Sequence, residues 1–195
     1  MNLFRTLGTV AVVALGWAGT SSCLKAPDFP VEPTITFSQV NSIYVPPTPT
    51  SSIGGDTIEF VINFQDGDGD LGLDADEVDV PPYNSPTGGH NNLSKGNNFF
   101  IQAYKLNKQK GGLFELFYTS NGGYLGENDS RYPRLETNRD AKPAPLKGTL
   151  RYKLPLRLNR TDYTIGDVFK FELSIMDRAF HESNKVTTTA VTLGP

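Results

Sequence analysis

Alternating apolar and polar residues recur along the chain and restrict it to a β fold. The clearest example is Thr57–Gln65, in which Ile58, Phe60, Ile62 and Phe64 alternate with mostly polar residues. This two-residue period is that of a strand with one buried face. Helical spacing with capping residues is not sustained anywhere after the N-terminal stretch. The sequence therefore predicts an all-β protein.

Turn residues separate seven segments that carry this strand pattern. Pro and Gly number 14 and 19 in the 195 residues, which favours short strands and many turns. Pro155 places its strand at a sheet edge or a bulge. We therefore expect one domain over residues 34–195, an immunoglobulin-like antiparallel β-sandwich of about seven strands with two long loop insertions. The predicted strands are Thr34–Tyr44, Thr57–Gln65, Phe99–Leu106, Leu113–Thr119, Thr149–Leu158, Val168–Met176 and Val186–Leu193, and the insertions are Val78–Asn98 and Ser120–Gly148.

Residues 1–22 have the features of a signal peptide. Arg5 precedes an apolar run that is short for a membrane span, and small residues follow it. Cys23, the only cysteine, comes next. This order is similar to a bacterial lipobox, in which the thiol takes a diacylglycerol, although Thr20 stands where Leu is usual. We expect a lipid on Cys23 and a Pro-rich tether over residues 23–33. The alternative is an ordinary secretory signal with an incidental cysteine.

A run of aspartates and glycines directly follows the Thr57–Gln65 strand. Asp66, Asp68 and Asp70 alternate with glycines, and Asp74 lies shortly after them. Carboxylate oxygens are the ligands that Ca²⁺ prefers, and glycine lets a loop curl round the ion. Several acids this close together also repel one another without a cation. These four aspartates are therefore candidate Ca²⁺ ligands.

The acidic run does not fit the helix–loop–helix calcium motif. Asp66, Asp68 and Asp70 fall at positions one, three and five of a twelve-residue calcium loop. Leu71 then occupies the sixth position, where that motif needs glycine, and a strand rather than a helix precedes the loop. Any calcium site here must belong to a β scaffold.

Sandwich topology supplies a second segment for this site. The second and sixth predicted strands end at the same pole of an immunoglobulin-like fold. The loop after the sixth strand begins with Asp177, and it also contains the weaker candidates Glu182 and Asn184. We expect Asp177 to complete a site with the acidic run. The alternative is a structural Asp-Gly turn, with Asp177 paired to Arg178 or Arg131.

The remaining residues argue against several other functions. The formal net charge is −3 and the basic residues are scattered, so a nucleic-acid partner is not expected. The two histidines, His90 and His181, are not in a metal-spaced pair, which disfavours zinc. No Gly-x-Ser-x-Gly elbow is present. Paired carboxylates for glycoside cleavage remain open, but the sequence favours a protein that is not an enzyme.

Three tyrosines in the long loops are candidate binding residues. Tyr83, Tyr124 and Tyr132 could stack on sugar rings or enter a partner's pocket. The alternative is that they pack against their own loops.

Two motifs and the N-terminal region resemble a family of small outer-membrane lipoproteins of Bacteroidota. In that family a strand ends in Phe-x-Asp-Gly-Asp-Gly-Asp-Leu-Gly, as Phe64–Gly72 does here. The family also closes with an Asp-Arg-Ala-Gly-Asn-x-Ser-Asn-like loop, which Asp177–Asn184 matches in part. Phe180 and His181 replace the common Gly-Asn and put a tight turn in doubt.

The resemblance implies an immunoglobulin-like domain on a lipid anchor, without a known activity. We therefore expect an outer-membrane protein, anchored on either face of that membrane. Its expected role is that of a binding or accessory subunit of an envelope protein complex. A carbohydrate-binding surface lipoprotein is the alternative.

Overall fold

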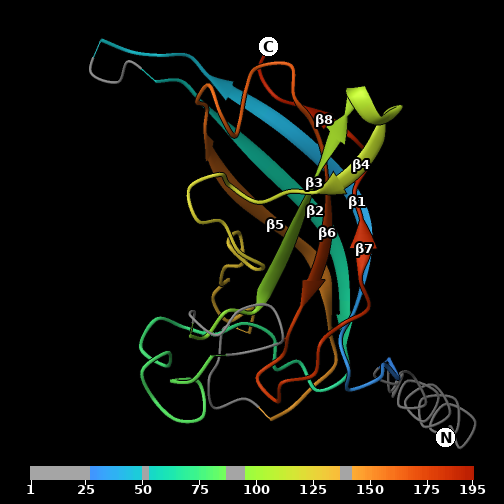
Figure 1. Cartoon of the computed structure of the whole chain (residues 1–195). Helices are drawn as coiled ribbons and strands as arrows, with labels where there is room; N and C mark the ends of the chain where they lie inside the picture. Colours follow the sequence, from blue (N-terminus) through green and yellow to red (C-terminus); the bar gives the residue numbers. More distant parts are fainter. Residues whose placement is uncertain (1–26, 50–52, 87–94, 137–141) are drawn as a thin grey trace, which may run out of the picture.

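The computed structural model shows two antiparallel sheets packed face to face as a sandwich (Figure 1). It describes residues 27–49, 53–86, 95–136 and 142–195. One sheet has the strand order β1-β2-β5, and the other has the order β4-β3-β6-β7, with β8 also paired to β6. The strands are β1 (Thr34–Val45), β2 (Gly55–Asp66), β3 (Phe99–Asn107), β4 (Leu113–Leu116), β5 (Leu146–Arg157), β6 (Val168–Ile175), β7 (Val186–Thr187) and β8 (Val191–Thr192).

This architecture confirms the predicted all-β, immunoglobulin-like sandwich. The β3–β4 pair is the expected hairpin, closed by a short 3₁₀ turn over Lys108–Lys110. Pro155 lies on β5, which is an edge strand of its sheet, as the proline requires. The two long connections, 67–98 and 117–145, correspond to the expected insertions.

The last predicted strand is wrong in one respect, because it is two short strands instead of one. β7 and β8 both pair with β6, at Glu172↔Thr187 and Phe169↔Val191. Thr188 lies between them and bonds β6 with its backbone and its hydroxyl, which accepts from the Phe171 amide at 3.0 Å. A side chain thus replaces part of the regular strand ladder, and a pattern of β-branched residues cannot reveal that.

The alternating residues of the predicted strands fill the space between the two sheets. Ile58, Phe60 and Ile62 of β2 are fully buried, as are Phe169 and Leu173 of β6. The ring of Phe60 meets that of Phe171 edge to face, with centroids 5.0 Å apart, and so joins the sheets. The core therefore holds β2 and β6 in a fixed relation, and their ends meet at one pole.

The segment before β1 is packed against the same pole instead of extending freely from it. Phe29 is half-buried, and Pro33 is buried. A side chain at Gly67 would collide with the carbonyl oxygens of Phe29 and Pro30. The acidic run thus lies on the backbone of the segment that leads toward the N-terminus.

The predicted signal peptide, the lipidation site Cys23 and His90 lie outside the described residues. Within the described part of the chain, no helix is long and apolar enough to cross a membrane.

Candidate cation site at one pole of the sandwich

The ends of β2 and β6 bring two distant segments of the chain side by side. Asp66 is the last residue of β2, and Asp177 follows closely after β6. Leu71 and Asp177 form a β-bridge, and the Arg178 amide donates to the Asp70 carbonyl at 3.2 Å. The expected meeting of the acidic run with the Asp177 loop is therefore confirmed.

Leu71 explains why the acidic run departs from the helix–loop–helix calcium motif. Its side chain is fully buried and belongs to the hydrophobic core. Its carbonyl accepts from the Leu135 amide at 3.1 Å. The loop thus turns back into the core after Asp70, where a helix–loop–helix calcium loop would continue round its ion.

Three aspartates converge at this pole. One carboxylate oxygen from each of Asp66, Asp70 and Asp177 lies within 4.8 Å of the other two. Oxygens that bind Ca²⁺ at about 2.4 Å can lie up to about 4.8 Å apart across the ion. The spacing of the three oxygens therefore fits a single Ca²⁺ ion. We refer to these three residues as the aspartate triad.

Four carboxylate oxygens at this pole are buried without a hydrogen-bond partner. Asp66 is fully buried, and neither of its carboxylate oxygens accepts a hydrogen bond. One oxygen each of Asp68 and Asp70 is also buried without a partner. The described residues contain six such side-chain atoms, and four belong to these three aspartates. Unpaired buried carboxylates are costly, so their concentration here makes this pole a candidate site for a cation.

Burial and mutual repulsion also raise the pKa values of two triad residues. Burial, together with the charges of Asp68, Asp70 and Asp177, raises the pKa of Asp66 from 3.8 to about 7. Burial and the charges of Asp177 and Asp68 also raise the pKa of Asp70 to about 6, although Arg178 opposes this. Without a cation, the folded protein therefore disfavours the charged form of both residues.

Asp177 has a different environment from Asp66, because its carboxylate is held in place. One oxygen accepts the His181 amide at 2.7 Å, and the other lies 2.8 Å from the His181 Nδ1. This contact raises the pKa of His181. Asp177 pairs with neither of the arginines considered above, since Arg178 binds Glu136 and Arg131 donates to the Leu73 carbonyl. These bonds fix the orientation of one candidate ligand.

Two of the predicted ligands lie outside the triad. Asp74 accepts from the Arg134 backbone amide at 3.2 Å, and its own amide donates to Glu77 at 2.9 Å. The backbone carbonyl of Asp68 accepts from the Ala144 amide at 3.0 Å. Asp68 still contributes negative charge to the site, whereas Asp74 belongs to a separate network around Arg134.

The two weaker candidates in the Asp177 loop have structural roles. Asn184 bonds both backbone groups of Ile35, with its side-chain oxygen 2.8 Å from the Ile35 amide, and so fixes the start of β1. Glu182 accepts from the Ser174 hydroxyl at 2.6 Å. Neither residue is in the triad.

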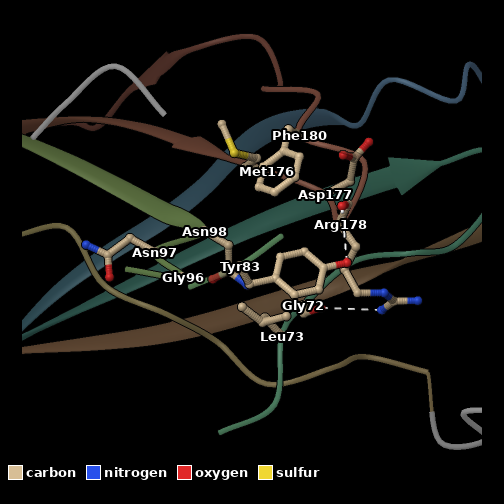
Figure 2. Close-up of a pocket in the computed structure, with 10 residues that line it drawn as sticks. All are labelled: Gly72, Leu73, Tyr83, Gly96, Asn97, Asn98, Met176, Asp177, Arg178 and Phe180. Atoms are coloured by element: carbon tan, nitrogen blue, oxygen red, sulfur yellow. Dashed lines mark hydrogen bonds between the residues drawn. The ribbon is translucent and has the colours of Figure 1, made fainter. Parts of the chain in front are cut away.

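Phe180 adopts the left-handed backbone conformation that usually favours glycine. Its φ is +69°, the only positive value for a residue other than glycine among those described. The ring is 39% exposed and lies against Tyr83, with centroids 5.6 Å apart (Figure 2). The Tyr83 hydroxyl donates to the Arg178 carbonyl at 3.3 Å. A tight turn therefore forms at Phe180 although this residue is not glycine, and no sequence pattern predicted the contact between Phe180 and Tyr83.

The three candidate tyrosines differ in accessibility. Tyr132 is 2% exposed and packs in the core edge to face with Phe99, so the expectation that it binds a sugar or a partner is wrong. Burial also raises its pKa. Tyr83 is half-buried against Phe180, whereas Tyr124 is 41% exposed. The alternation pattern could not place Tyr132, because it lies in a loop that folds back over the core.

Gly72 is the glycine of the acidic run that should tolerate substitution least. Its φ is +88°, and a side chain would collide with the backbone of Pro133 and Arg134. We expect Gly72→Ala to destabilise the fold by about 3 kcal/mol, which would lower the melting temperature by about 6–12 °C. Gly122 is the matched control, because its φ is +80° and its surroundings are open. Equal losses from Gly72→Ala and Gly122→Ala in thermal melts would contradict the packing argument.

No family model, curated protein or solved structure matches this chain.

Proposed function

We propose that this chain is a lipid-anchored outer-membrane lipoprotein that serves as a binding or accessory subunit of an envelope protein complex, without enzymatic activity. In this proposal a Ca²⁺ ion bound by the aspartate triad stabilises one pole of the sandwich. The observation that supports Ca²⁺ binding is the fully buried Asp66, whose two oxygens have no hydrogen-bond partner and lie beside Asp70 and Asp177. The sequence before Cys23 supports the anchor.

The role of the ion is structural in this proposal. The triad joins the loop after β2 to the loop after β6, and the backbone of the same pole contacts the segment before β1. An ion there would oppose the repulsion among the carboxylates and hold the three segments together. Waters and backbone carbonyls would complete the six to eight oxygens that Ca²⁺ requires.

Calorimetric titration of the metal-free protein with Ca²⁺ tests the ion. We expect saturable binding of one Ca²⁺, with weaker binding of Mg²⁺, which requires a smaller and more regular shell. At a free Ca²⁺ concentration 100 times the dissociation constant, binding stabilises the fold by about 2.7 kcal/mol. If millimolar Ca²⁺ produced neither heat of binding nor a change in melting temperature, the proposed Ca²⁺ binding would be refuted.

The anchor and the partner require separate experiments in cells. Incorporation of a radiolabelled fatty acid into the wild-type chain, and its loss in Cys23→Ser, would support lipidation. Gentle solubilisation of membranes followed by affinity purification should recover a stoichiometric membrane-protein partner. Absence of any such partner would count against the subunit role.

Carbohydrate binding is the second candidate, and the contact between Phe180 and Tyr83 favours it. The two rings lie beside Asp177 at the candidate cation site (Figure 2), and exposed aromatic rings stack well on sugars. A glycan array probed with the Ca²⁺-loaded protein tests this role. Binding that is lost in Phe180→Gly would favour it over the subunit role.

A further inference from the structure

The outward side of the β1-β2-β5 sheet carries a row of positive charge. Along β5 the leucines at 150, 154 and 156 point into the core, and the residues between them are mostly exposed. This alternation places four basic side chains on the solvent side, all of them exposed, at Lys147, Arg151, Lys153 and Arg157. With a rise of about 3.4 Å per residue, the row extends over about 34 Å.

The neighbouring strands do not neutralise this row. The strand registers place every second residue of β2 on the same side as the four basic residues, and their partners in β1 follow with one shift at the bulge between Phe37 and Gln39. Among these outward positions Glu59 is the only acid, and it lies 3.7 Å from Arg151, whose side chain is 61% exposed. Four positive charges and one negative charge give this side +3, whereas the whole chain carries −3. We refer to this side as the basic face.

The basic face lies on the sheet that the N-terminal tether enters. Thr34, the first residue of β1, pairs with Gln65, and Gln65 pairs with Lys147. The start of the sandwich and the first basic residue of the row are thus about 10 Å apart, across two strand spacings. Cys23 precedes Thr34 by eleven residues, which can span at most about 40 Å. A lipid on Cys23 would therefore keep this sheet close to the membrane surface.

We propose that the basic face lies against the anionic headgroups of the membrane that holds the lipid anchor. A sheet face that carries a row of lysine and arginine is complementary in charge to a surface of phosphate groups. The domain then lies with its β1-β2-β5 sheet along the membrane. This inference rests on the proposed anchor, which supplies the nearness to the membrane.

Charged residues on an edge strand also prevent edge-to-edge aggregation, so the experiment must separate the two roles. The chain from residue 23 onward, carrying Cys23→Ser, lacks both the expected signal peptide and the acylation site, and it is sedimented with phosphatidylcholine vesicles with or without phosphatidylglycerol. We expect binding only to the anionic vesicles, and weaker binding as the salt concentration rises. Equal binding to both kinds of vesicle, or no binding to either, would overturn the proposal.

Charge-neutralising variants test whether the row itself is responsible. Replacing all four basic residues of the row by glutamine should weaken binding to anionic vesicles at least tenfold, since each charge near a membrane accounts for about a fivefold change. A control set removes the same charge from other exposed positions and should change binding less than twofold. An equal loss in the control set would overturn the proposal. The control substitutions are Lys95→Gln, Lys108→Gln, Lys110→Gln and Lys185→Gln.

A second measurement remains informative if the variant with all four basic residues replaced by glutamine aggregates. In the Cys23→Ser chain, a single cysteine replaces either Lys153 on the basic face or Lys108 in the β3–β4 turn, and carries an environment-sensitive dye. Anionic vesicles should shift the emission of the dye at 153 and leave that at 108 unchanged. A shift only at 108 would overturn the proposed orientation. Failure of fatty-acid labelling in cells would instead refute the anchor, because these assays use chains without it.

Discussion

Asp66→Asn is expected to stabilise the cation-free protein and to abolish its response to Ca²⁺. The asparagine has the same shape, carries no charge, and offers N–H groups to the neighbouring carboxylates of Asp70 and Asp177. It therefore removes both the unpartnered charge and one ligand. We expect a gain of about 1–3 kcal/mol without Ca²⁺, or about 2–12 °C in melting temperature.

This test compares the melting temperatures of the two proteins with and without Ca²⁺. The wild-type protein should gain about 5–11 °C when Ca²⁺ is present at 100 times its dissociation constant, and Asp66→Asn should gain nothing. Asp79→Asn is a matched control, because Asp79 is exposed, lies in the same loop and is not in the triad. It should keep the full response to Ca²⁺. A destabilised Asp66→Asn protein that still responds to Ca²⁺ would show that the triad is not the binding site.

Removal of the Phe180 ring, which contacts Tyr83 at this pole, provides a comparison with the effect of Asp66→Asn. Phe180 lies three residues from Asp177, but it contributes no oxygen ligand. Phe180→Gly should therefore leave the response to Ca²⁺ intact, since glycine adopts the same φ without strain. Calorimetry in which this variant loses Ca²⁺ binding would instead place the aromatic ring in the ion site.

The residues that form regular strands were readable from the sequence, because burial on one face imposes a two-residue period. Ile58, Phe60, Ile62 and Phe64 show this on β2, where all four are buried, although Val61 on the other side of the strand is buried as well. The meeting of the acidic run with the Asp177 loop could also be predicted from the sequence, since sandwich topology places the ends of β2 and β6 at one pole. Both predictions rest on geometry that every sandwich of this kind shares.

Loop residues were much harder to place, because no period governs them. Tyr132 and Asp74 illustrate this, as one enters the core and the other joins the network around Arg134. The selection of Asp70 over Asp68 as a triad member depends on how Leu71 re-enters the core. Such details follow from tertiary packing, which alternation and motif spacing do not encode.

The stability of the cation-free protein is expected to rise when the pH falls from 7.5 to 5. Asp66 has a folded-state pKa of about 7 against an ordinary value of 3.8, so between these values the folded protein binds more protons than the unfolded chain. Its contribution to stability is therefore complete below pH 3.8 and is lost as the pH rises through 7. For Asp66 alone, the gain between pH 7.5 and pH 5 is about 2.5 kcal/mol. The raised pKa of His181 acts in the same direction.

Ca²⁺ should flatten this dependence, because the bound ion keeps the triad deprotonated in the folded protein. In saturating Ca²⁺ the folded and unfolded states then bind nearly equal numbers of protons at the triad between pH 7.5 and pH 5, so the contribution of the triad to stability should change little over this range. Chemical denaturation at a series of pH values, with chelator or with Ca²⁺, measures both curves. Asp66→Asn isolates the contribution of the buried carboxylate, since its cation-free curve should keep only the weaker dependence from Asp70 and His181. A wild-type cation-free curve that falls steadily from pH 7.5 to pH 5 would mean that Asp66 is satisfied in the folded protein, and the triad would then have no need of an ion.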